Sequence, residues 1–165
     1  METLVVYYSQ SGNTKLIAEA VAKQLHADVL EIRLKREYPA KGFPKYFIGG
    51  MTAIFRMLPK LDGPDKKPGD YRNLVIGTPV WAGTCCAPIR SFLRRNRVEN
   101  KRIALFVCHA SSEPGTAGKC FADLKKELAG NTFAGETDFV EPLKHGSEEN
   151  AKKAAEWAAG LGFPA

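Results

Sequence analysis

The sequence predicts an α/β fold, a three-layer, doubly wound sandwich in which helices cover both faces of a parallel sheet. Short apolar segments alternate along the chain with segments in which apolar residues recur at helical spacing. Residues 3–34 hold a strand, a helix and a second strand in succession, and a helical connection of this kind joins parallel strands. Over the whole chain, five predicted strands alternate with four or five predicted helices.

The first two strands and the helix between them are the clearest elements. Residues 3–8 form an apolar, β-branched and aromatic run, which is typical of a buried strand. Within residues 14–26 the apolar side chains recur every three or four positions, and charged residues take the outer face. Residues 28–34 alternate apolar and polar side chains, which predicts the second strand.

Residues 35–69 are the least regular part of the chain, because Pro and Gly recur in it. Residues 43–58 nevertheless predict a helix despite two glycines in its middle. Its large apolar side chains gather on one side: Phe47, Ile48, Met51, Ile54, Phe55 and Leu58. We expect this helix to cover the core. Because basic residues flank it, docking on a membrane surface or on a partner protein is the alternative.

The middle of the chain returns to the alternation of strands and helices. Residues 73–78 form a continuous apolar run that predicts a central strand. Pro88 suits the first turn of a helix, which runs to Arg95. Residues 102–108 predict the next strand.

The last third of the chain completes the pattern. A small-residue loop at 109–118 leads into a helix that ends at Gly130. Residues 132–140 predict a weaker strand. Ser147, with two glutamates after it, is a typical start for the final amphipathic helix.

Size and composition are those of one globular domain, residues 1–165. The N-terminal apolar run is too short for a signal peptide, and no stretch is predicted to span a membrane, so we expect a cytoplasmic protein. The four cysteines lack metal-binding spacing and are expected to be reduced thiols. No metal site is predicted.

The chain is basic, with a formal net charge of +6. The basic residues are spread along the chain, and the densest group falls on one helix and its exit: Arg90, Arg94, Arg95, Arg97, Lys101 and Arg102. This group has no interleaved aromatic residues and no nucleic-acid-binding motif, so no nucleic-acid partner is expected. A solvated helix face is the first interpretation, and a surface for an acidic partner is the second.

Residues 9–14, Ser-Gln-Ser-Gly-Asn-Thr, join the first strand to the first helix. Backbone N–H groups and hydroxyls converge in such a turn, and the positive end of the helix dipole favours an anion. An ordinary N-cap is the alternative, because Ser, Asn and Thr are common at helix starts. Three hydroxyl side chains and Gly12 exceed what a cap needs, so we predict a phosphate site.

Ligands of open parallel sheets bind beyond the carboxyl ends of the strands. The loops at that edge are residues 9–14, 79–84 and 109–118. The second loop presents Trp81, an aromatic plane that suits stacking on a ring, although packing of Trp81 in the core is the alternative. A phosphate site beside an aromatic surface predicts a phosphorylated planar cofactor.

Nucleotide-binding signatures are missing from the sequence. No strand is followed by the G-x-G-x-x-G fingerprint of dinucleotide sites. Residues 115–120 are only superficially similar to a P-loop, because Glu113 stands where the motif needs Gly and Cys120 where it needs Ser or Thr.

These motifs resemble those of the flavodoxin family, and the resemblance runs along the whole chain. Residues 9–14 are similar to the family's phosphate loop, and residues 77–84 to the loop whose aromatic residue packs on the isoalloxazine ring. Residues 108–118 take the place of the loop that closes the other side of the ring. The resemblance implies a flavodoxin-like sheet of five parallel strands in the order 2-1-3-4-5, and non-covalent FMN as the cofactor.

The resemblance also implies a set of cofactor-binding residues: Ser9, Gln10, Ser11, Gly12, Asn13, Thr14, Pro79, Val80, Trp81, Ala82, Gly83, His109, Ala110, Ser111 and Ser112. Four side chains would donate to the phosphate: Ser9, Ser11, Asn13 and Thr14. Gln10 and Gly12 would contribute backbone N–H groups. Trp81 would stack on the flavin, and the peptide between Ala82 and Gly83 would lie near its N5 atom.

The cysteines and histidines suggest no separate chemistry. Cys85 and Cys86 are adjacent, and because adjacent cysteines form strained disulfides, packed or half-exposed thiols are expected. Cys108 and His109 do not form a nucleophile dyad, since neighbours at a strand end point to opposite faces. His109 is expected near the flavin edge.

The resemblance implies a one-domain electron carrier that shuttles electrons between redox partner proteins. No catalytic residue is predicted, because the chemistry belongs to the cofactor. The alternative is an FMN-dependent NAD(P)H:quinone or related oxidoreductase; a third possibility is a flavin-binding module whose helix at 43–58 docks a partner. One departure is that flavodoxins are typically acidic, whereas this chain is basic and Glu113 is the only carboxylate in its three loops. We therefore expect redox partners with an acidic docking surface.

Overall fold

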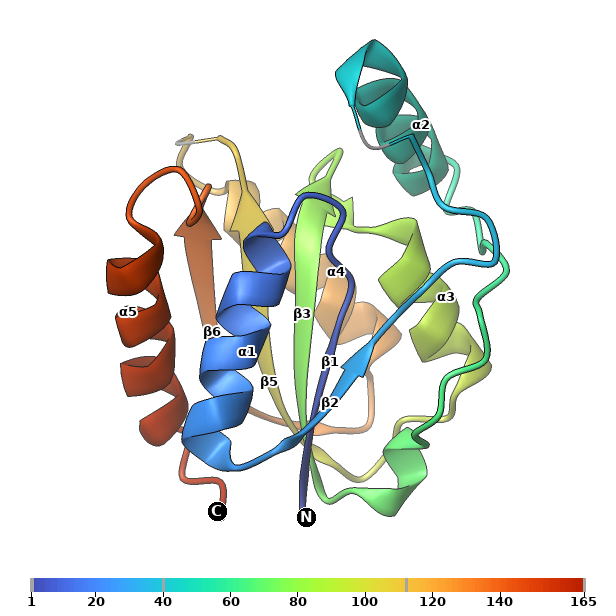
Figure 1. Ribbon diagram of the computed structural model, residues 1–165. Helices are drawn as coiled ribbons and strands as arrows, with labels where there is room; N and C mark the ends of the chain where they lie inside the picture. Colours follow the sequence, from blue (N-terminus) through green and yellow to red (C-terminus); the bar gives the residue numbers. More distant parts are fainter. Residues whose placement is uncertain (1, 40, 112, 165) are drawn as a thin grey trace.

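The computed structural model describes residues 2–39, 41–111 and 113–164, and a parallel sheet runs through its centre (Figure 1). The parallel strands are β1 (Thr3–Tyr7), β2 (Asp28–Glu31), β3 (Asn73–Trp81), β5 (Arg102–His109) and β6 (Thr132–Val140). Their order is β2-β1-β3-β5-β6, and the short strand β4 (Thr84–Cys85) pairs antiparallel with the end of β3. Counted without β4, this is the predicted order 2-1-3-4-5, so the fold class is confirmed.

Helices cover both faces of the sheet (Figure 1). One face is covered by α1 (Asn13–Leu25) and α5 (Ser147–Ala159), and the other by α3 (Ala87–Arg95) and α4 (Thr116–Glu127). In α1 the buried residues include Ile17, Val21 and Leu25, four apart in the sequence, so they form one apolar stripe against the sheet. A single 3-10 turn, η1 (Pro68–Asp70), precedes β3.

Residues of β1 alternate between the two cores. Leu4 and Val6 pack in the core beneath α3 and α4, whereas Val5 and Tyr7 pack in the core beneath α1 and α5. Because both faces of the strand are buried, its sequence is a continuous apolar run and does not alternate with polar residues. The same reason explains the apolar runs of β3 and β5.

A glycine in β3 lets a phenylalanine ring of β5 cross the strand. Gly77 is the partner of Phe106 in the parallel register. A Cβ atom at Gly77 would lie 2.1 Å from the Phe106 ring, a separation that atoms do not reach. Glycine at this position is therefore required by packing.

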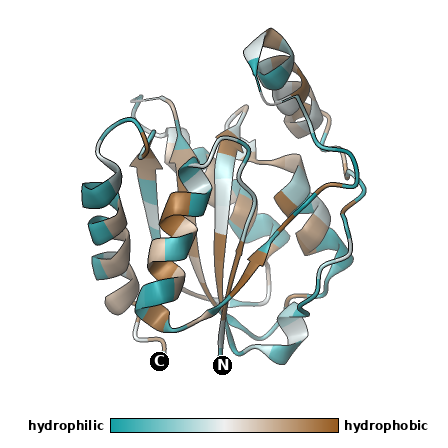
Figure 2. Ribbon diagram, in the orientation of Figure 1, coloured by the Kyte–Doolittle hydropathy of each residue, from teal (hydrophilic) through white to brown (hydrophobic). Residues whose placement is uncertain are grey.

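The helix predicted over residues 43–58 is found as α2 (Gly42–Ile54), but it does not cover the core. It stands out from the body of the molecule, and Figure 2 shows hydrophobic residues on it. Its buried residues are the small Gly49, Thr52 and Ala53, whereas Phe47 and Ile54 of the predicted inward face are exposed. The prediction that this helix covers the core is wrong. The helix packs against the body of the protein through these small residues, which allow close approach of the backbone, and its large apolar side chains face away. No helix within the described residues has the length and apolar character needed to cross a bilayer.

Candidate functional site

The loop after β1, the end of β3 and the end of β5 with the start of its loop meet at the carboxyl edge of the sheet and surround a hollow of about 120 Å³. Its lining residues are Ser9, Gln10, Ser11, Asn13, Thr14, Tyr46, Pro79, Val80, Cys108, His109, Ala110 and Glu141. All three predicted loops thus contribute to one site. A larger hollow lies beside β2, between residues 29–33 and 62–65, but it touches none of these loops.

The first loop combines a helix cap with an anion cradle. Ser9 Oγ accepts hydrogen bonds from the backbone N–H groups of Gly12 (3.1 Å) and Lys15 (3.2 Å). Gly12 has φ +92°, and a Cβ there would lie 3.1 Å from the Leu143 side chain, so the turn needs glycine. Asn13 and Thr14 open α1, and the first N–H groups of a helix have no partner inside it. These N–H groups and the dipole of α1 favour an anion.

Thr14 links the first loop to the end of β5. It is buried, and its hydroxyl contacts the thiol of Cys108. Burial raises the pKa of Cys108 to about 12, and the Thr14 contact opposes this rise. Cys85, Cys86 and Cys120 are also buried, and burial raises the pKa of each thiol, so all four are protonated near neutrality.

Residues 79–84, predicted as a loop, form a β-hairpin. Trp81 pairs with Thr84, and the two residues between them, Ala82 and Gly83, have φ values of +49° and +75°. Positive φ at both central positions is the pattern of a type I′ turn, which matches the twist of the strands. The hairpin places Pro79 and Val80 on the hollow, whereas residues 81–83 lie next to it and outside its lining.

Trp81 is packed from several sides. Its ring centroid lies 5.8 Å from that of Tyr8 and 5.9 Å from that of Tyr38. A Cβ atom at Gly49 of α2 would lie 3.4 to 3.5 Å from three atoms of the indole, so α2 covers part of the ring. The side chain is partly exposed. Both interpretations of Trp81, as a core residue and as a stacking surface, therefore have structural support, and its contact with a flavin stays a prediction.

His109 is held by two hydrogen bonds at the end of β5. Its Nδ1 lies 2.6 Å from the carbonyl oxygen of Ser111 and its Nε2 lies 2.8 Å from Asp138 Oδ2. These two contacts hold the imidazole ring in place at the edge of the hollow. His109 and Ala110, two of the predicted cofactor-binding residues, line the hollow, and the carbonyl of Ser111 contacts the His109 ring. Ser112, also predicted for the site, lies outside the described residues.

The sequence interpretation did not assign Glu141 and Tyr46, which line the hollow, or Leu143, whose backbone contacts the first loop. Glu141, after β6, lines the hollow and is paired with Lys144 (3.3 Å) and His145 (3.6 Å). The backbone N–H of Leu143 donates to Asn13 Oδ1 at 3.0 Å, which ties the β6–α5 loop to the first loop. Topology could have indicated the residues after β6, because the carboxyl end of this parallel strand lies at the same edge of the sheet. Tyr46 of α2 gave no signal, because α2 was expected to cover the core.

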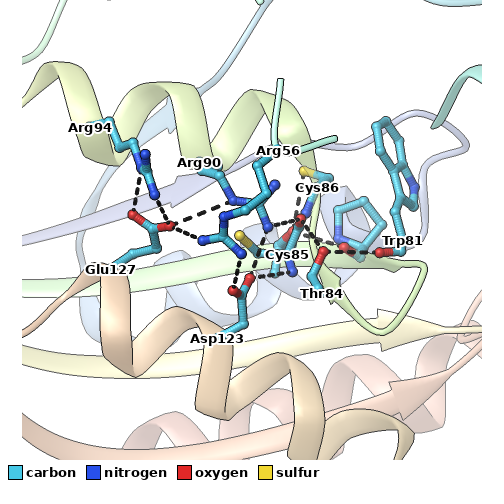
Figure 3. Close-up of polar contacts among 11 residues, drawn as sticks. Arg56, Trp81, Thr84, Cys85, Cys86, Arg90, Arg94, Asp123 and Glu127 are labelled. Atoms are coloured by element: carbon cyan, nitrogen blue, oxygen red, sulfur yellow. Dashed lines mark hydrogen bonds and ion pairs between the residues drawn. The ribbon is translucent and has the colours of Figure 1, made fainter. Parts of the chain in front are cut away.

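A network of ion pairs contacts the second strand of the hairpin (Figure 3). Arg90, fully buried, donates to Asp123 Oδ2 at 2.9 Å and to the carbonyl of Cys85 at 3.3 Å. The N–H of Cys85 donates to the same carboxylate. Arg94 and Arg56 pair with Glu127. The prediction that the arginine-rich helix presents a solvated face is therefore wrong for Arg90. This side chain is buried and lies beside Asp123 and Glu127 of α4.

The pKa values of both carboxyl groups are lowered. At Asp123 burial raises the pKa, but hydrogen bonds from Arg56 and Arg90 outweigh it. At Glu127 the hydrogen bond from Arg94 holds the pKa down against burial. Within the described residues, no group of three or more His, Cys, Asp or Glu side chains is placed to hold a metal ion.

Solved structures with the same architecture are flavodoxin-like flavoproteins. A flavoprotein from Lactobacillus acidophilus NCFM, in complex with FMN, matches with a TM-score of 0.70 and 22% identity over 87% of this chain and 97% of that chain. Flavodoxin 2 from Bacillus cereus matches with a TM-score of 0.58 and 16% identity over 98% of this chain and 97% of that chain. A flavodoxin, WrbA-like protein from Agrobacterium tumefaciens matches with a TM-score of 0.51 and 18% identity over 94% of this chain and 96% of that chain.

No protein-family model and no curated protein sequence matches the chain. The structural likeness, together with the strand order, shows that the chain has the flavodoxin-like fold. The carboxyl edge of that fold is where the hollow lies.

Proposed function

We propose that this protein binds FMN non-covalently and carries electrons between redox partner proteins. The observation that carries the proposal is the convergence of the three predicted loops on one hollow. The first loop would hold the phosphate with the side chains of Ser9, Ser11, Asn13 and Thr14 and with backbone N–H groups. The hairpin and the loop after β5 would hold the ring. FMN supplies the electron-transfer chemistry when it is bound.

The residues of the hollow fit a phosphate through neutral donors. Neither Lys nor Arg is among its lining residues, so hydroxyl, amide and backbone N–H groups at the start of α1 would carry the recognition. Glu141 would repel an anion, but Lys144 lies beside it and offsets its charge. Gly12 keeps the turn free of a side chain that would meet Leu143.

Titration of the apoprotein with FMN tests the binding. We expect quenching of flavin fluorescence with a one-to-one stoichiometry, and riboflavin, which lacks the phosphate, should bind more weakly. Equal affinity for both would contradict the phosphate assignment. The flavin form is then mixed anaerobically and aerobically with NAD(P)H. A carrier should show no rapid turnover, whereas rapid turnover with a quinone would indicate the NAD(P)H:quinone oxidoreductase.

A further inference from the structure

The segment of residues 41–60, here called the α2 segment, exposes large apolar side chains. They are Phe43, Tyr46, Phe47, Ile54, Phe55, Met57 and Leu58. Phe43 is 77% exposed and Tyr46 73%, and both lie in the first half of α2. Elsewhere in the part of the chain that the structure describes, Leu143 is the only other large apolar side chain with comparable exposure. A patch of this kind marks an interaction surface.

The orientation of α2 is fixed by contacts on its other side. Phe43, Phe47 and Ile54 share the outward face at helical spacing, and the rings of Phe43 and Phe47 stack with centroids 5.6 Å apart. The opposite face, with Gly49 on the indole of Trp81, is packed. Beyond its end, Arg56 donates to Asp123 at 2.9 Å and pairs with Glu127, which anchors the segment to α4 (Figure 3). The helix therefore holds its aromatic face outward.

The charge of the α2 segment has a single sign. It carries Lys41, Lys45, Arg56 and Lys60, and no Asp or Glu occurs between Glu37 and Asp62. Arg56 is engaged by α4, whereas Lys41 and Lys60 are exposed. Lys45 lies 5.5 Å from the centroid of the Tyr46 ring, so its charge stays beside the aromatic patch. Exposed aromatic residues flanked by cations complement a surface that is apolar within and anionic outside.

We propose that the α2 segment docks this protein on the surface of a bilayer with anionic headgroups. The rings of Phe43 and Phe47 enter the boundary between headgroups and acyl chains, and the lysines contact the headgroup phosphates. Because Tyr46 also lines the hollow, docking places the candidate site beside the bilayer.

A bilayer fits this surface better than a protein does. In a two-fold contact with a second copy, the same cations of both chains would face one another, which disfavours association. A partner protein would need a groove for a helix that projects from the body (Figure 1), whereas a fluid bilayer adapts to it.

Co-sedimentation with vesicles tests the proposal. The protein is mixed with vesicles of equimolar phosphatidylcholine and phosphatidylglycerol and with vesicles of phosphatidylcholine alone. We expect binding to the anionic vesicles that added salt weakens, and little binding to the neutral ones. The double variant Phe43→Ala/Phe47→Ala should lower the partition coefficient by about tenfold or more, since two interfacial rings are lost.

Two charge variants with the same net charge show whether the lysines of the α2 segment or the net charge of the whole protein attracts it to anionic vesicles. Lys41→Glu/Lys45→Glu and Lys152→Glu/Lys153→Glu each replace two exposed or half-exposed lysines, the first pair on the α2 segment and the second on α5. The α2 pair should lower binding by about tenfold or more, and the α5 pair by no more than about twofold, because charge acts close to the membrane. Equal losses in both would overturn the proposal.

Two further measurements complete the test. Circular dichroism checks that the variants fold, and in a Phe43→Trp variant the emission of the new tryptophan should shift to the blue with anionic vesicles only. Absence of this shift, or no sedimentation with anionic vesicles, would exclude docking on a bilayer. A concentration-dependent dimer that the Phe43→Ala/Phe47→Ala change abolishes would assign the patch to a second copy instead.

Discussion

At the scale of the residue, the hydroxyl of Ser9 reconciles the two interpretations of the first loop. Ser9 Oγ accepts from the N–H groups of Gly12 and Lys15, which is the work of a cap. The hydroxyls of Ser11 and Thr14 and the first N–H groups of α1 are not used in this way, and they border the hollow. The same short segment thus caps the helix and places further hydroxyl and N–H groups at the hollow, which is why composition alone could not separate a cap from a phosphate site.

Replacing Thr14 by valine removes one donor without changing the shape of the side chain. We expect Thr14→Val to weaken FMN binding by about tenfold, roughly the loss of one hydrogen bond to a charged group, while the apoprotein stays folded. Fluorescence titration measures the affinity. Thr132→Val, at the opposite end of the sheet, is the matched control and should bind FMN as the unaltered protein does. An unchanged affinity of Thr14→Val would show that Thr14 does not contact the phosphate.

Ala82 is strained in the hairpin because it is a non-glycine residue with φ +49°. Glycine accepts this conformation without steric cost, so Ala82→Gly should raise the free energy of unfolding by about 0.5–1 kcal/mol. Urea denaturation measures the change. Ala155→Gly, inside α5, is the control and should lower stability by about 1 kcal/mol. A loss of stability in Ala82→Gly would mean that the turn is not strained.

At the scale of the element, the network around Glu127 joins α2, α3 and α4. The Glu127 side chain is 8% exposed and pairs with Arg56 and Arg94, with Arg90 Nε 3.7 Å away. Glu127 is largely buried, but Arg56 and Arg94 are about half exposed, so Glu127→Gln should cost about 1–2 kcal/mol at neutral pH. Glu148→Gln, at the exposed start of α5, should change stability by less than about 0.5 kcal/mol. Urea midpoints of the two variants test the network.

The same network predicts how stability depends on pH. Hydrogen bonds from arginines lower the pKa of Glu127 and, against burial, that of Asp123 in the folded protein. Their contribution is complete above the ordinary values of 4.5 and 3.8 and is lost as the pH falls through the lowered ones. The unfolding midpoint should therefore decrease below about pH 4.5, and less steeply in Glu127→Gln, in which Asp123 is the one carboxyl group of this network that still titrates. Parallel curves for both proteins would contradict this assignment.

Elements with a clear period were predictable, and those whose position depends on long-range contacts were not. The strands and α1 followed from their apolar patterns, and the site loops followed because parallel strands end at one edge. The pattern of residues 43–58 predicted a helix but not its orientation. The contact of α2 with Trp81 is made at Gly49, and a residue without a side chain adds nothing to an apolar pattern. The roles of Glu141 and Leu143 depend on hydrogen bonds between distant loops, which no local pattern encodes.

At the scale of the whole molecule, the hollow is formed by segments that are far apart in the sequence. Residues at or just after the carboxyl ends of β1, β3, β5 and β6 meet there only because the strand order β2-β1-β3-β5-β6 brings those strands together. The carboxylates near the site, Glu141 and Asp138, each have a basic neighbour, Lys144 and His109. The structure thus adds carboxylates to the Glu113 visible in the sequence, but Lys144 offsets Glu141, and the net charge of +6 still sets the sign of the long-range field.

That field should act on redox reagents according to their charge. For the reduced FMN form, electron transfer to the ferricyanide anion should slow with added salt, because screening weakens its attraction to a basic protein. Transfer to a cationic cobalt(III) complex should accelerate, since screening weakens a repulsion. Stopped-flow rates over a range of ionic strength measure both. Lys152→Glu/Lys153→Glu lowers the net charge from +6 to about +2 and should flatten both dependences. If the two reagents respond to salt in the same direction, the field at the flavin is not set by the net charge, and an acidic docking surface on the natural partner is no longer expected.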